Sequence, residues 1–509
     1  MVTTATETEL KYEAPDEVAL PGAAELDQLP AVAGIREGAA EELVAQYFDT
    51  ADLRLIRAGI TLRRRVGGHD EGWHLKMPAG PHTRREIRLP LGDGNLKVPA
   101  ELAERVLVYT RTKPLRPAAV ITTLRTRLLL LGEGGDELAE LAVDQVHAKP
   151  ANGAGESWRE VELELAGGDA ALLDAADRLL RRSGLTQAKN TAKFERAMGI
   201  QPAGQRGSGQ AELAPESPAA EVVLAYLREQ VGAIKSLDPA VRASEPDSVH
   251  QLRITIRRIR AVLDAFGPVI WRADVGPLSE ELRWLGNLLG AARDAEVLAA
   301  RLRRALDDTS AELVIGPVAA RVQAHFAPVA ASAQAAASKA LSGGRYFALL
   351  DQLDELFAES ALATGATRPA SEVLRPAVRK AYRRTRRRAH LARHATPGHD
   401  RDVAVHQVRK ATKRARYAAE VLAPAMGKPA SRFARQMKRL QSQLGDFQDS
   451  VIARRTEREL GIAAAVAGEN AFTYGILYQR DVAEGRHAAG LAEQTWAKAT
   501  RPKYVSWLS

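Results

Sequence analysis

Two pairs of matching segments in the second half of the chain constrain its fold more than any other feature. The segment VHQLRITIRRIRAVLDAFGP at 249–268 matches VHQVRKATKRARYAAEVLAP at 405–424, an offset of 156 residues. LRWLGNLLGAARDAEVL at 282–298 matches MKRLQSQLGDFQDSVIA at 437–453, an offset of 155. Because the two matches share nearly the same offset, they predict two copies of one structural unit.

The residues around these segments predict helices. From about Glu221 onward the chain is rich in Ala, Leu, Arg and Glu, and its apolar residues recur about every 3.6 positions. Gly and Pro clusters at 266–268, 341–344, 363–369 and 395–400 predict breaks between helices. We therefore expect two related helical bundles that face each other, one at about 221–365 and the other at about 370–509.

The first 200 residues predict a β-rich domain instead. Short alternating runs are separated by turn-forming clusters such as GGHDEG and LGDGN. The predicted strands are Glu7–Tyr12, Val44–Phe48, Thr61–Val66, Trp73–Met77, Arg84–Leu89, Val120–Leu131, Glu137–Val146 and Trp158–Leu165, with helices around Ala100–Tyr109 and Ala170–Ser183. The stretch 201–220 is rich in Gly, Pro, Ser and Gln and predicts a linker between domains 1–200 and 221–509.

Composition excludes several classes of protein. The chain has no cysteine, which removes disulfides and Cys-ligated metals and fits a cytoplasmic location. Its N-terminus is acidic, unlike a signal peptide, and no apolar run approaches the ~18 residues of a membrane span. The 72 Lys and Arg outnumber the 63 Asp and Glu, which favours an anionic partner, but the 5% aromatic content disfavours a base-stacking nucleic-acid binder.

Within several predicted strands, charged residues recur at every second position. Glu7, Glu9 and Lys11 share one face of the first strand, because side chains alternate with a period of two. Charges repeat in the same way at Glu160, Glu162, Glu164, Glu140, Asp144, Arg63, Arg65, Arg125, Arg127, Arg84, Glu86 and Arg88. Taken strand by strand, a solvated sheet face explains such alternation.

Taken together, the strands favour a closed sheet with charges inside, because Glu gathers on some strands and Arg on others. Crowded carboxylates repel one another unless a cation lies between them, and hard oxygen ligands suit Mg²⁺ or Mn²⁺. Arginine and lysine side chains suit phosphate oxygens. The pattern predicts an interior site for a metal–polyphosphate chelate.

These motifs resemble the CYTH domain, the triphosphate tunnel metalloenzyme family. Glu7-x-Glu9-x-Lys11 is similar to the family's ExExK signature, and YFDTADLRLIRAGITLRRR at 47–65 resembles its Y-x-D-T…L-R-x-R stretch. WHLKMP (73–78), TRREIRLPL (83–91), TLRTR (123–127), ELAVDQV (140–146), REVELEL (159–165) and AKNTAKFERA (188–197) follow in family order. The resemblance covers about residues 3–200 and implies an eight-stranded antiparallel β-barrel that forms a tunnel.

The same resemblance implies metal-dependent hydrolysis of a triphosphate, with Mg²⁺ or Mn²⁺ as cofactor. The implied metal ligands are Glu7, Glu9, Glu162 and Glu164, with Glu160 as a weaker candidate. The implied catalytic residues are Glu7, Glu9, Lys11 and Lys76. The implied triphosphate-binding residues are Lys11, Arg63, Arg65, Lys76, Arg84, Arg125, Arg127 and Lys193.

Two positions depart from the family pattern. Arg88 stands where many members continue an acidic alternation, and Ala192 precedes Lys193 where the family usually has serine. Both departures leave the substrate preference open. Family members also include adenylate cyclases and thiamine triphosphatases, although no purine or thiazole pocket is evident here.

Both copies of the helical repeat carry the pattern His-xx-Arg-xxx-(Arg/Lys)-xx-Arg. The two stripes are His250, Arg253, Arg257, Arg260 and His406, Arg409, Lys413, Arg416. Offsets of 3, 7 and 10 fall on one side of a helix, and no acidic residue interrupts either stripe. A further helix from 373 to about 394 is also basic without any acid. A solvated face explains any one stripe, but the duplication favours an anionic ligand.

This half resembles the CHAD domain over about 218–509, and CYTH followed by CHAD is a known architecture. The resemblance implies two four-helix bundles related by pseudo-twofold symmetry around a basic cavity that binds inorganic polyphosphate. The implied contacts are the two stripes together with Lys410, Arg379 and Arg383, and further contacts from Lys380 and Arg414.

We therefore expect a metal-dependent hydrolase of inorganic tripolyphosphate or long-chain polyphosphate whose helical domain binds the polymer. The alternative is a non-catalytic polyphosphate-binding or granule-targeting protein. Nucleic acid is a disfavoured partner because Tyr382 and Tyr417 are almost the only aromatic residues among the basic ones. No membrane partner is expected, and the expected location is the cytoplasm, with polyphosphate granules as an associated site.

Overall fold

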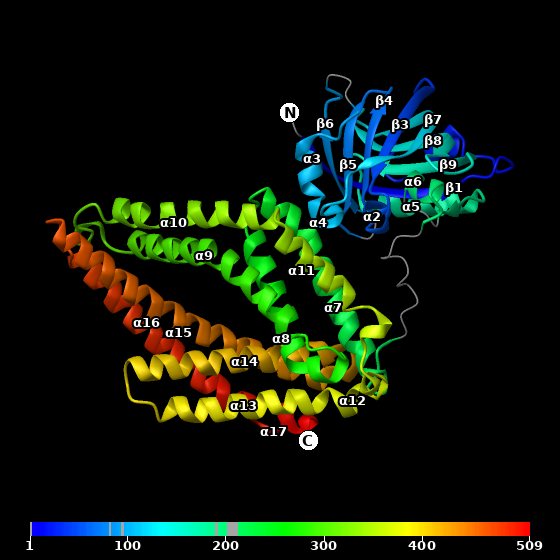
Figure 1. Ribbon diagram of the computed structural model, residues 1–509. Coiled ribbons are helices and arrows are strands. Elements are labelled where there is room, and N and C mark those ends of the chain that lie inside the picture. Colours follow the sequence, from blue (N-terminus) through cyan, green and yellow to red (C-terminus); the bar gives the residue numbers. More distant parts are fainter. Residues whose placement is uncertain (1–2, 81–82, 93–95, 189–191, 201–211) are drawn as a thin grey trace. The chain divides into compact units, whose positions relative to one another are not determined.

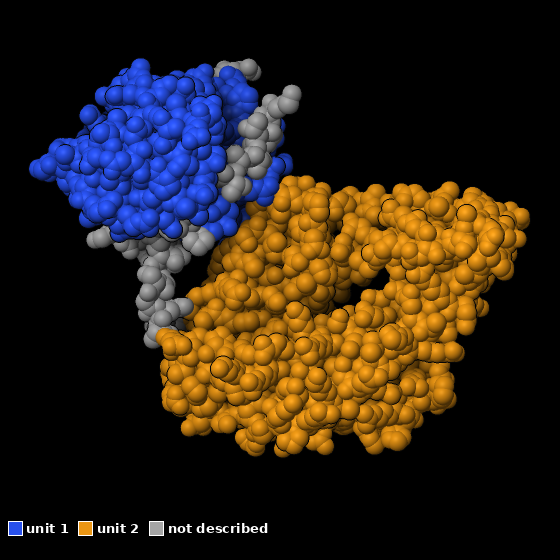
Figure 2. Space-filling view, turned by 180° about the vertical axis from the view of Figure 1, so that it is seen from behind, with its two compact units in different colours: residues 1–210 blue, residues 211–509 orange. Residues whose placement is uncertain are grey.

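The computed structural model describes residues 3–80, 83–92, 96–188, 192–200 and 212–509. The chain divides into two compact units, Met1–Gln210 and Ala211–Ser509, which Figure 2 colours separately. The predicted linker 201–220 falls largely on 201–211, outside the described residues, and the first helix of the second unit begins at Ala219. No helix among the described residues is both long and apolar enough to cross a membrane.

Eight strands of the first unit form a closed antiparallel β-barrel, which confirms the fold expected for this part (Figure 1). The order around the barrel is β1–β6–β5–β4–β3–β7–β8–β9, and β9 pairs with β1 to close it. The strands are β1 (Thr3–Glu13), β3 (Glu41–Asp49), β4 (Thr61–Val66), β5 (Gly72–Pro78), β6 (Thr83–Leu89), β7 (Arg116–Leu131), β8 (Glu137–Pro150) and β9 (Glu156–Leu165).

Two short strands extend the sheet beyond the barrel. β2 (Gly34–Glu37) pairs with the end of β7, and β10 (Thr186–Gln187) pairs with the end of β1. The sequence did not predict them, because four and two residues are too few to show an alternation. The sequence also did not predict the short helices α1 (Ala23–Leu26), α2 (Arg54–Arg57) and α6 (Lys193–Ala197), because they are too short to show a helical periodicity.

The barrel carries its apolar side chains on the outside, where helices cover them. Leu10, Tyr12 and Leu163 are buried in a cluster with Leu172 and Leu180 of α5 (Ala170–Arg182). A second cluster lies between β4–β6 and the helices α3 (Ala100–Arg105) and α4 (Leu107–Thr110). Because side chains alternate along a strand, burying one set outward turns the charged set into the barrel.

The turn after β3 is fixed by a buried carboxylate. Asp49 accepts hydrogen bonds from the backbone N–H groups of Thr50, Leu55 and Ile56 at 2.7, 2.9 and 3.0 Å. These bonds satisfy donors at the start of α2 that would otherwise lack partners. The aspartate of the YFDT motif is therefore a structural residue of this turn, and it lies outside the tunnel lining.

The second unit is helical, as predicted. Its long helices are α7 (Ala219–Arg242), α8 (Ser248–Ile270), α9 (Gly276–Asp307), α10 (Val318–Leu341), α11 (Gly344–Glu355), α13 (Arg375–Arg393), α14 (His399–Met426), α15 (Lys428–Val466) and α16 (Phe472–Ala499). Two four-residue helices, α12 (Ala370–Val373) and α17 (Pro502–Val505), complete the α-helical elements. The repeated segments form α8 and α14, and then α9 and α15.

The two helical sets, α7–α10 and α13–α16, meet in two places. In one place α8 packs against α14. In the other, Leu302 and Phe326 of the first set share a core with Leu460 and Leu477 of the second. Figure 2 shows an opening through this unit between its helical arms.

One predicted break lies two residues before the observed end of its helix. The cluster at 266–268 does not end the helix, because α8 continues through Pro268 to Ile270. A proline in the last turn removes a single backbone hydrogen bond, which the end of a helix tolerates. The other three predicted breaks fall between helices: 341–344 between α10 and α11, 363–369 between α11 and α12, and 395–400 between α13 and α14.

Candidate functional site

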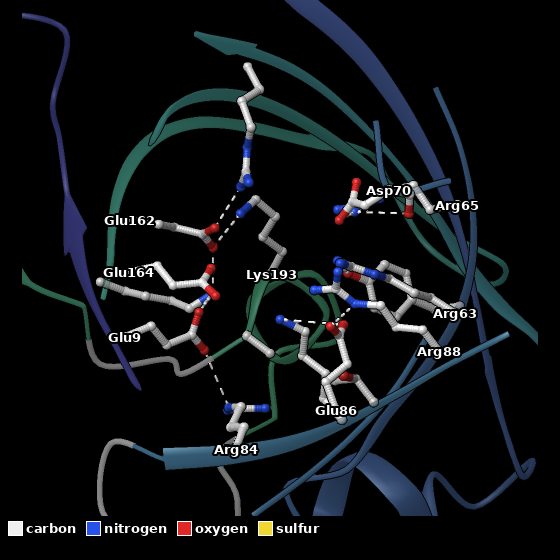
Figure 3. Close-up of a pocket in the computed structure, with 16 residues that line it drawn as sticks. Glu9, Arg63, Arg65, Asp70, Arg84, Glu86, Arg88, Glu162, Glu164 and Lys193 are labelled. Carbon is white, nitrogen blue, oxygen red and sulfur yellow. Dashed lines mark hydrogen bonds and ion pairs between the residues drawn. The ribbon is translucent and has the colours of Figure 1, made fainter. Parts of the chain in front are cut away.

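The interior of the barrel is a charged cavity. Among the described residues, eight cationic side chains and five carboxylates line it, together with Tyr47, Thr61 and Ala192. Figure 3 shows Glu9, Glu162 and Glu164 along one wall, with Arg63, Arg65 and Arg88 facing them from the other. Because the cationic side chains outnumber the carboxylates, the cavity is suited to a ligand that carries several negative charges.

The acidic wall consists of three neighbouring strands. β1 pairs with β9 in the register Glu9↔Glu164 and Lys11↔Glu162, and β9 pairs with β8 so that Asp144 faces Glu160. Glu7 lies on β1 opposite Arg84 of β6, and its side chain is outside the described part of the structure. Strand pairing therefore concentrates carboxylates that are far apart in the sequence.

The centre of this wall is a cluster of three carboxylates around one ammonium. Oxygens of Asp144, Glu160 and Glu162, defined here as the three-carboxylate cluster, lie within 4.8 Å of one another. The Nζ atom of Lys193 lies 2.8, 2.7 and 2.6 Å from Asp144, Glu160 and Glu162. Phe194, the next residue, is fully buried and stacks on Tyr47 at 4.8 Å, so α6 is anchored with Lys193 inside the barrel.

The three-carboxylate cluster fits a divalent cation. It offers convergent hard oxygen donors, which suit Mg²⁺ or Mn²⁺, and the structure already places one positive charge at their centre. The fit differs from the expected ligand set in one respect. Asp144 and Glu160 join Glu162 here, whereas Glu9 and Glu164 lie beside them on the same wall.

Ion pairs join the carboxylates of the acidic wall to cations on the same or nearby strands. Arg125 donates to Asp144 at 2.6 Å and to Glu162 at 2.6 Å, and Arg84 lies 3.5 Å from Glu9. Lys11 donates to Glu162, and its Nζ lies 3.6 Å from Glu9. These pairs leave a free volume of only about 60 Å³, so a triphosphate would enter by displacing carboxylate partners from the cations.

The pairing holds the buried groups in their charged forms. Burial opposes ionisation of Glu162, but Lys11, Lys193 and Arg125 outweigh it and hold the pKa of Glu162 well below its usual range. Burial likewise opposes the charge of Lys193, yet Asp144, Glu160 and Glu162 raise its pKa well above the ordinary value. Anionic ligands and metal ions would therefore meet fully charged side chains at neutral pH.

A wider chamber of about 220 Å³ adjoins the cavity. The two share Arg65, Asp70, Arg88, Arg125 and Glu164 as lining residues. Arg127 belongs to this outer chamber, where it donates to Glu41 at 2.7 Å and lies 2.7 Å from a ring nitrogen of His69. Arg127 therefore lies farther along the tunnel than the other predicted phosphate ligands.

The structure brings most of the predicted tunnel residues into one cavity. The residues that line it are Glu9, Lys11, Arg63, Arg65, Lys76, Arg84, Arg125, Glu162, Glu164 and Lys193. Sequence reasoning missed Tyr47 and Asp70, and it did not assign Asp144 a role. Asp144 shares a strand face with Glu140 in the sequence, but only the register of β8 with β9 shows that it meets Glu160.

The two departures from the family pattern have structural counterparts. Arg88 donates to Glu86 at the basic wall and adds a cation to both chambers. Ala192 precedes α6, and the Glu195 carboxylate accepts its backbone N–H at 3.2 Å. This bond is the glutamate half of a capping box, whereas Ala192 lacks the side-chain oxygen with which a serine would form the other half.

The helical unit brings the two predicted stripes together. α8 carries His250, Arg253, Arg257 and Arg260, α14 carries His406, Arg409, Lys413 and Arg416, and the two helices are in contact. Burial, followed by the charges of Arg409, Arg257 and Arg253, lowers the pKa of Lys413 to about 7. Such repulsion means that cations from both helices crowd one region.

Two of the stripe residues have acidic partners and others do not. Arg253 donates to Asp294 at 2.9 Å, and Arg416 donates to Glu420 at 2.6 Å. Among the described residues, Arg257, Arg409 and Lys413 have no carboxylate within 4.0 Å. The Nε atoms of Arg257 and Arg409 are buried without a hydrogen-bond partner among these residues. Buried donors without acceptors favour a bound anion.

One arginine of each stripe lies against a glycine of a neighbouring helix. Arg253 Nη1 lies 3.4 Å from the carbonyl oxygen of Gly290, and a Cβ at Gly290 would lie 3.2 Å from Arg253 Nη2. In the second copy, a Cβ at Gly445 would lie 3.5 Å from Arg409. Because the glycines occupy matching places in α9 and α15, both arginines lie across a helix surface without a side chain.

The basic residues of α13 are arranged differently. Lys380 and Arg383 are exposed and Arg379 is half-buried, and none has an ion pair with a described residue. Repulsion from Arg414 lowers the pKa of Arg384, which places that part of α13 near the exposed face of α14. Lys410 and Arg414 are also exposed, so these residues form an outer basic surface beside the stripes.

Two protein-family models match the chain, the CYTH domain over residues 5–197 and the CHAD domain over residues 225–457. Uncharacterized proteins MT2285 and Rv2226 of Mycobacterium tuberculosis, from strains CDC 1551 / Oshkosh and ATCC 25618 / H37Rv, are each 39% identical to it over 493 residues. The match covers 93% of this chain and 92% of each relative.

Two solved structures are also similar. PptA from Streptomyces chartreusis has a TM-score of 0.48 and 21% identity, and the similarity covers 55% of this chain and 100% of that chain. The CHAD domain from the plant Ricinus communis has a TM-score of 0.43 and 25% identity, covering 58% of this chain and 94% of that chain.

Proposed function

The chain belongs to the family of proteins that join a CYTH domain to a CHAD domain, and on this basis we propose that it hydrolyses inorganic triphosphate or polyphosphate with a divalent metal. In this proposal the β-barrel is the hydrolase and the helical unit binds the polyphosphate chain. The observation that carries it is the barrel interior, where opposing walls of carboxylates and cations face one cavity.

The roles of the tunnel residues follow from their positions. The three-carboxylate cluster, with Glu9 and Glu164 beside it and Glu7 on the same strand as Glu9, would hold Mg²⁺ or Mn²⁺. A bound divalent ion would neutralise phosphate oxygens and polarise the phosphorus. Lys11 and Lys193 start paired with carboxylates and exchange those partners for phosphate oxygens when the substrate enters.

The basic wall stabilises the charge that moves during the reaction. Phosphoryl transfer needs positioning and electrostatic stabilisation more than covalent help. Arg63, Arg65, Lys76 and Arg125 surround the cavity and hold the chain of phosphates in line. As the bond to the terminal phosphorus breaks, negative charge grows on the leaving phosphate, and these side chains stabilise it.

The helical unit would retain the polymer. Arg257, Arg409 and Lys413 lack carboxylate partners among the described residues, and an inorganic polyphosphate offers oxygens at short, regular intervals without bases. Binding there raises the local concentration of chain ends for a tethered hydrolase. The predicted association with polyphosphate granules would follow from the same contacts.

Phosphate release from tripolyphosphate, long-chain polyphosphate, ATP and thiamine triphosphate, each with Mg²⁺, Mn²⁺ or a chelator, tests the hydrolase. We expect metal-dependent release from the inorganic substrates that falls at least about 100-fold in Glu162→Gln. Glu156→Gln is the matched control, because Glu156 lies on the same strand but is exposed and pairs with Arg196.

Other results would replace the proposal. Polyphosphate binding without release in any metal would identify a binding protein, and pyrophosphate release from ATP alone would identify a cyclase. For the helical unit, Arg257→Ala with Arg409→Ala should weaken polyphosphate binding at least about 10-fold. Arg455→Ala is the control, since this exposed residue of α15 pairs only with Glu459 among the described residues. Unchanged binding in the double variant would refute the stripe assignment.

A further inference from the structure

A histidine and a glutamate form a buried pair behind the basic wall. Nδ1 of His74 on β5 lies 2.9 Å from Oε1 of Glu86 on β6, and Nε2 of His74 lies 2.9 Å from the backbone oxygen of Asp70. The side chains of His74 and Glu86 are 1% and 0% exposed. Glu86 lines the cavity, whereas His74 does not, so the imidazole reaches the tunnel only through Glu86.

The two acceptors around His74 determine how many protons the His74–Glu86 pair must hold to make both hydrogen bonds. A carboxylate oxygen and a carbonyl oxygen are both acceptors, and each faces one ring nitrogen. A neutral imidazole carries one N–H and satisfies only one of these acceptors. The pair therefore makes both hydrogen bonds only when it holds one additional proton, either on the imidazole or on Glu86.

The surrounding charges decide how readily that proton is bound. Arg63 and Arg65 on β4 disfavour an imidazolium, while Lys76 on β5 and Arg88 on β6 lie beside Glu86 and favour its carboxylate. Among the described residues, the Asp70 carboxylate is a further charged group beside His74, and it is paired with Arg65. Burial, and after it the charges of Arg63 and Arg65 against the opposing effect of Glu86, lowers the pKa of His74 to about 4.

We propose that His74 and Glu86 together accept the proton of the attacking water, with Glu86 as the group that faces the water and His74 as the positioning residue that stores the proton. This inference rests on the proposed hydrolysis. The water oxygen forms a bond to the terminal phosphorus while the bond from that phosphorus to the bridging oxygen breaks. The electron pair of the broken bond stays on the leaving phosphate. One water proton moves to the pair and the other stays on the new phosphate.

Substrate binding prepares the pair for this step. A polyanion in the cavity offsets the positive charge of Arg63 and Arg65, which are the groups that oppose protonation of His74. The proton affinity of the pair therefore rises when the substrate is present and stays low when the tunnel is empty. After the reaction, departure of the phosphates restores the repulsion and returns the proton to solvent.

Proton uptake in the whole chain tests this without requiring turnover. Tripolyphosphate is titrated into the protein at pH 6.5 in excess chelator by calorimetry, in two buffers with different ionisation enthalpies. We expect the wild-type protein to take up more protons per bound tripolyphosphate than His74→Asn and Glu86→Gln, each of which lacks one of the two titratable groups of the pair. His147→Asn is the control, because His147 is exposed on β8 and bonds only to Ser157 among the described residues. Equal uptake by all four proteins overturns the inference.

Steady-state kinetics provides the second readout. Loss of a proton acceptor should lower kcat by about 100-fold or more, with KM changed less than about twofold. It should also remove the acid limb of the pH profile of kcat, which a purely structural effect of His74 would leave in place. A variant that loses kcat but keeps the wild-type pH profile overturns the inference. Absent hydrolysis in the wild type, with the uptake difference retained, overturns the proposed function and supports the proton-storing pair.

Discussion

The protonation of Lys413 should make polyphosphate binding by the helical unit depend on pH. Its pKa is lowered to about 7 by burial and by Arg409, Arg257 and Arg253, with Asp449 acting in the opposite direction. At pH 8.5 the free protein therefore holds Lys413 mostly neutral. A bound polyphosphate offsets the three arginines, so the pKa of Lys413 returns toward its ordinary value of 10.5 and the lysine gains a proton.

The size of the effect follows from linkage between proton and ligand binding. With a pKa of about 7 in the free protein and a return to the ordinary 10.5 in the complex, the affinity for polyphosphate should rise about 16-fold between pH 8.5 and pH 7.0. At pH 8.0 binding should take up about 0.9 proton. His250 and His406 are mostly neutral in the free protein in this window, because burial lowers their pKa values.

Calorimetry of the full chain with long-chain polyphosphate at constant ionic strength measures both quantities. Long chains are preferred because nearly all their phosphates are internal and stay ionised across this range. Lys413→Arg should bind tightly at both pH values, and Lys413→Met should bind more weakly with little dependence on pH. A wild-type affinity that is flat from pH 8.5 to 7.0, or a slope that persists in Lys413→Met, would refute the reasoning.

Three further predictions concern packing and charge. Gly290→Ala places a Cβ 3.2 Å from the guanidinium of Arg253 and should weaken polyphosphate binding about threefold in a titration. Gly445→Ala is the matched control, because its Cβ would lie 3.5 Å from Arg409, and it should bind nearly normally. Equal effects of the two substitutions would contradict this account. Lys193→Met removes the ammonium that contacts all three carboxylates of the cluster and leaves Arg125 and Lys11 as cations beside only two of them, so Tm in chelator should fall and Mg²⁺ or Mn²⁺ should raise it more than in the wild type. A metal-independent Tm would count against the cluster as a cation site. Asp49→Ala removes three buried hydrogen bonds and should lower the free energy of unfolding of the barrel by about 2–4 kcal/mol in urea titrations, with catalysis at low temperature retained.

The sequence predicted the barrel strands well because they alternate over five or more residues. All eight predicted strands became barrel strands, and the alternating charges of Glu162 and Glu164 became interior charges. However, the alternation within one strand does not specify which residues of the neighbouring strand lie opposite. The meeting of Asp144, Glu160 and Lys193 depends on that register and on a short helix anchored by Phe194, which periodicity could not predict.

In the helical half, too, the sequence predicted the elements but not the contacts between them. The duplicated segments predicted which residues occupy equivalent positions in α8 and α14. They did not predict that Arg253 and Arg409 lie over Gly290 and Gly445, because that contact depends on how closely the neighbouring helices approach. The break expected at 266–268 came two residues too early, because a proline is tolerated in the last turn of a helix and does not fix the residue at which the helix ends.

The outward placement of the apolar side chains has a consequence for how such a barrel can change over time. Leu10, Tyr12 and Leu163 are held by the covering helices, so the packed core that supports folding contains none of the tunnel residues beside them on the same strands. A substitution of a tunnel charge on these strands changes its ionic partners and leaves this core in place, whereas Tyr47 belongs both to the tunnel lining and to a core cluster. The fold can therefore acquire a different phosphate substrate through interior replacements, while selection on the alternate positions keeps the barrel folded.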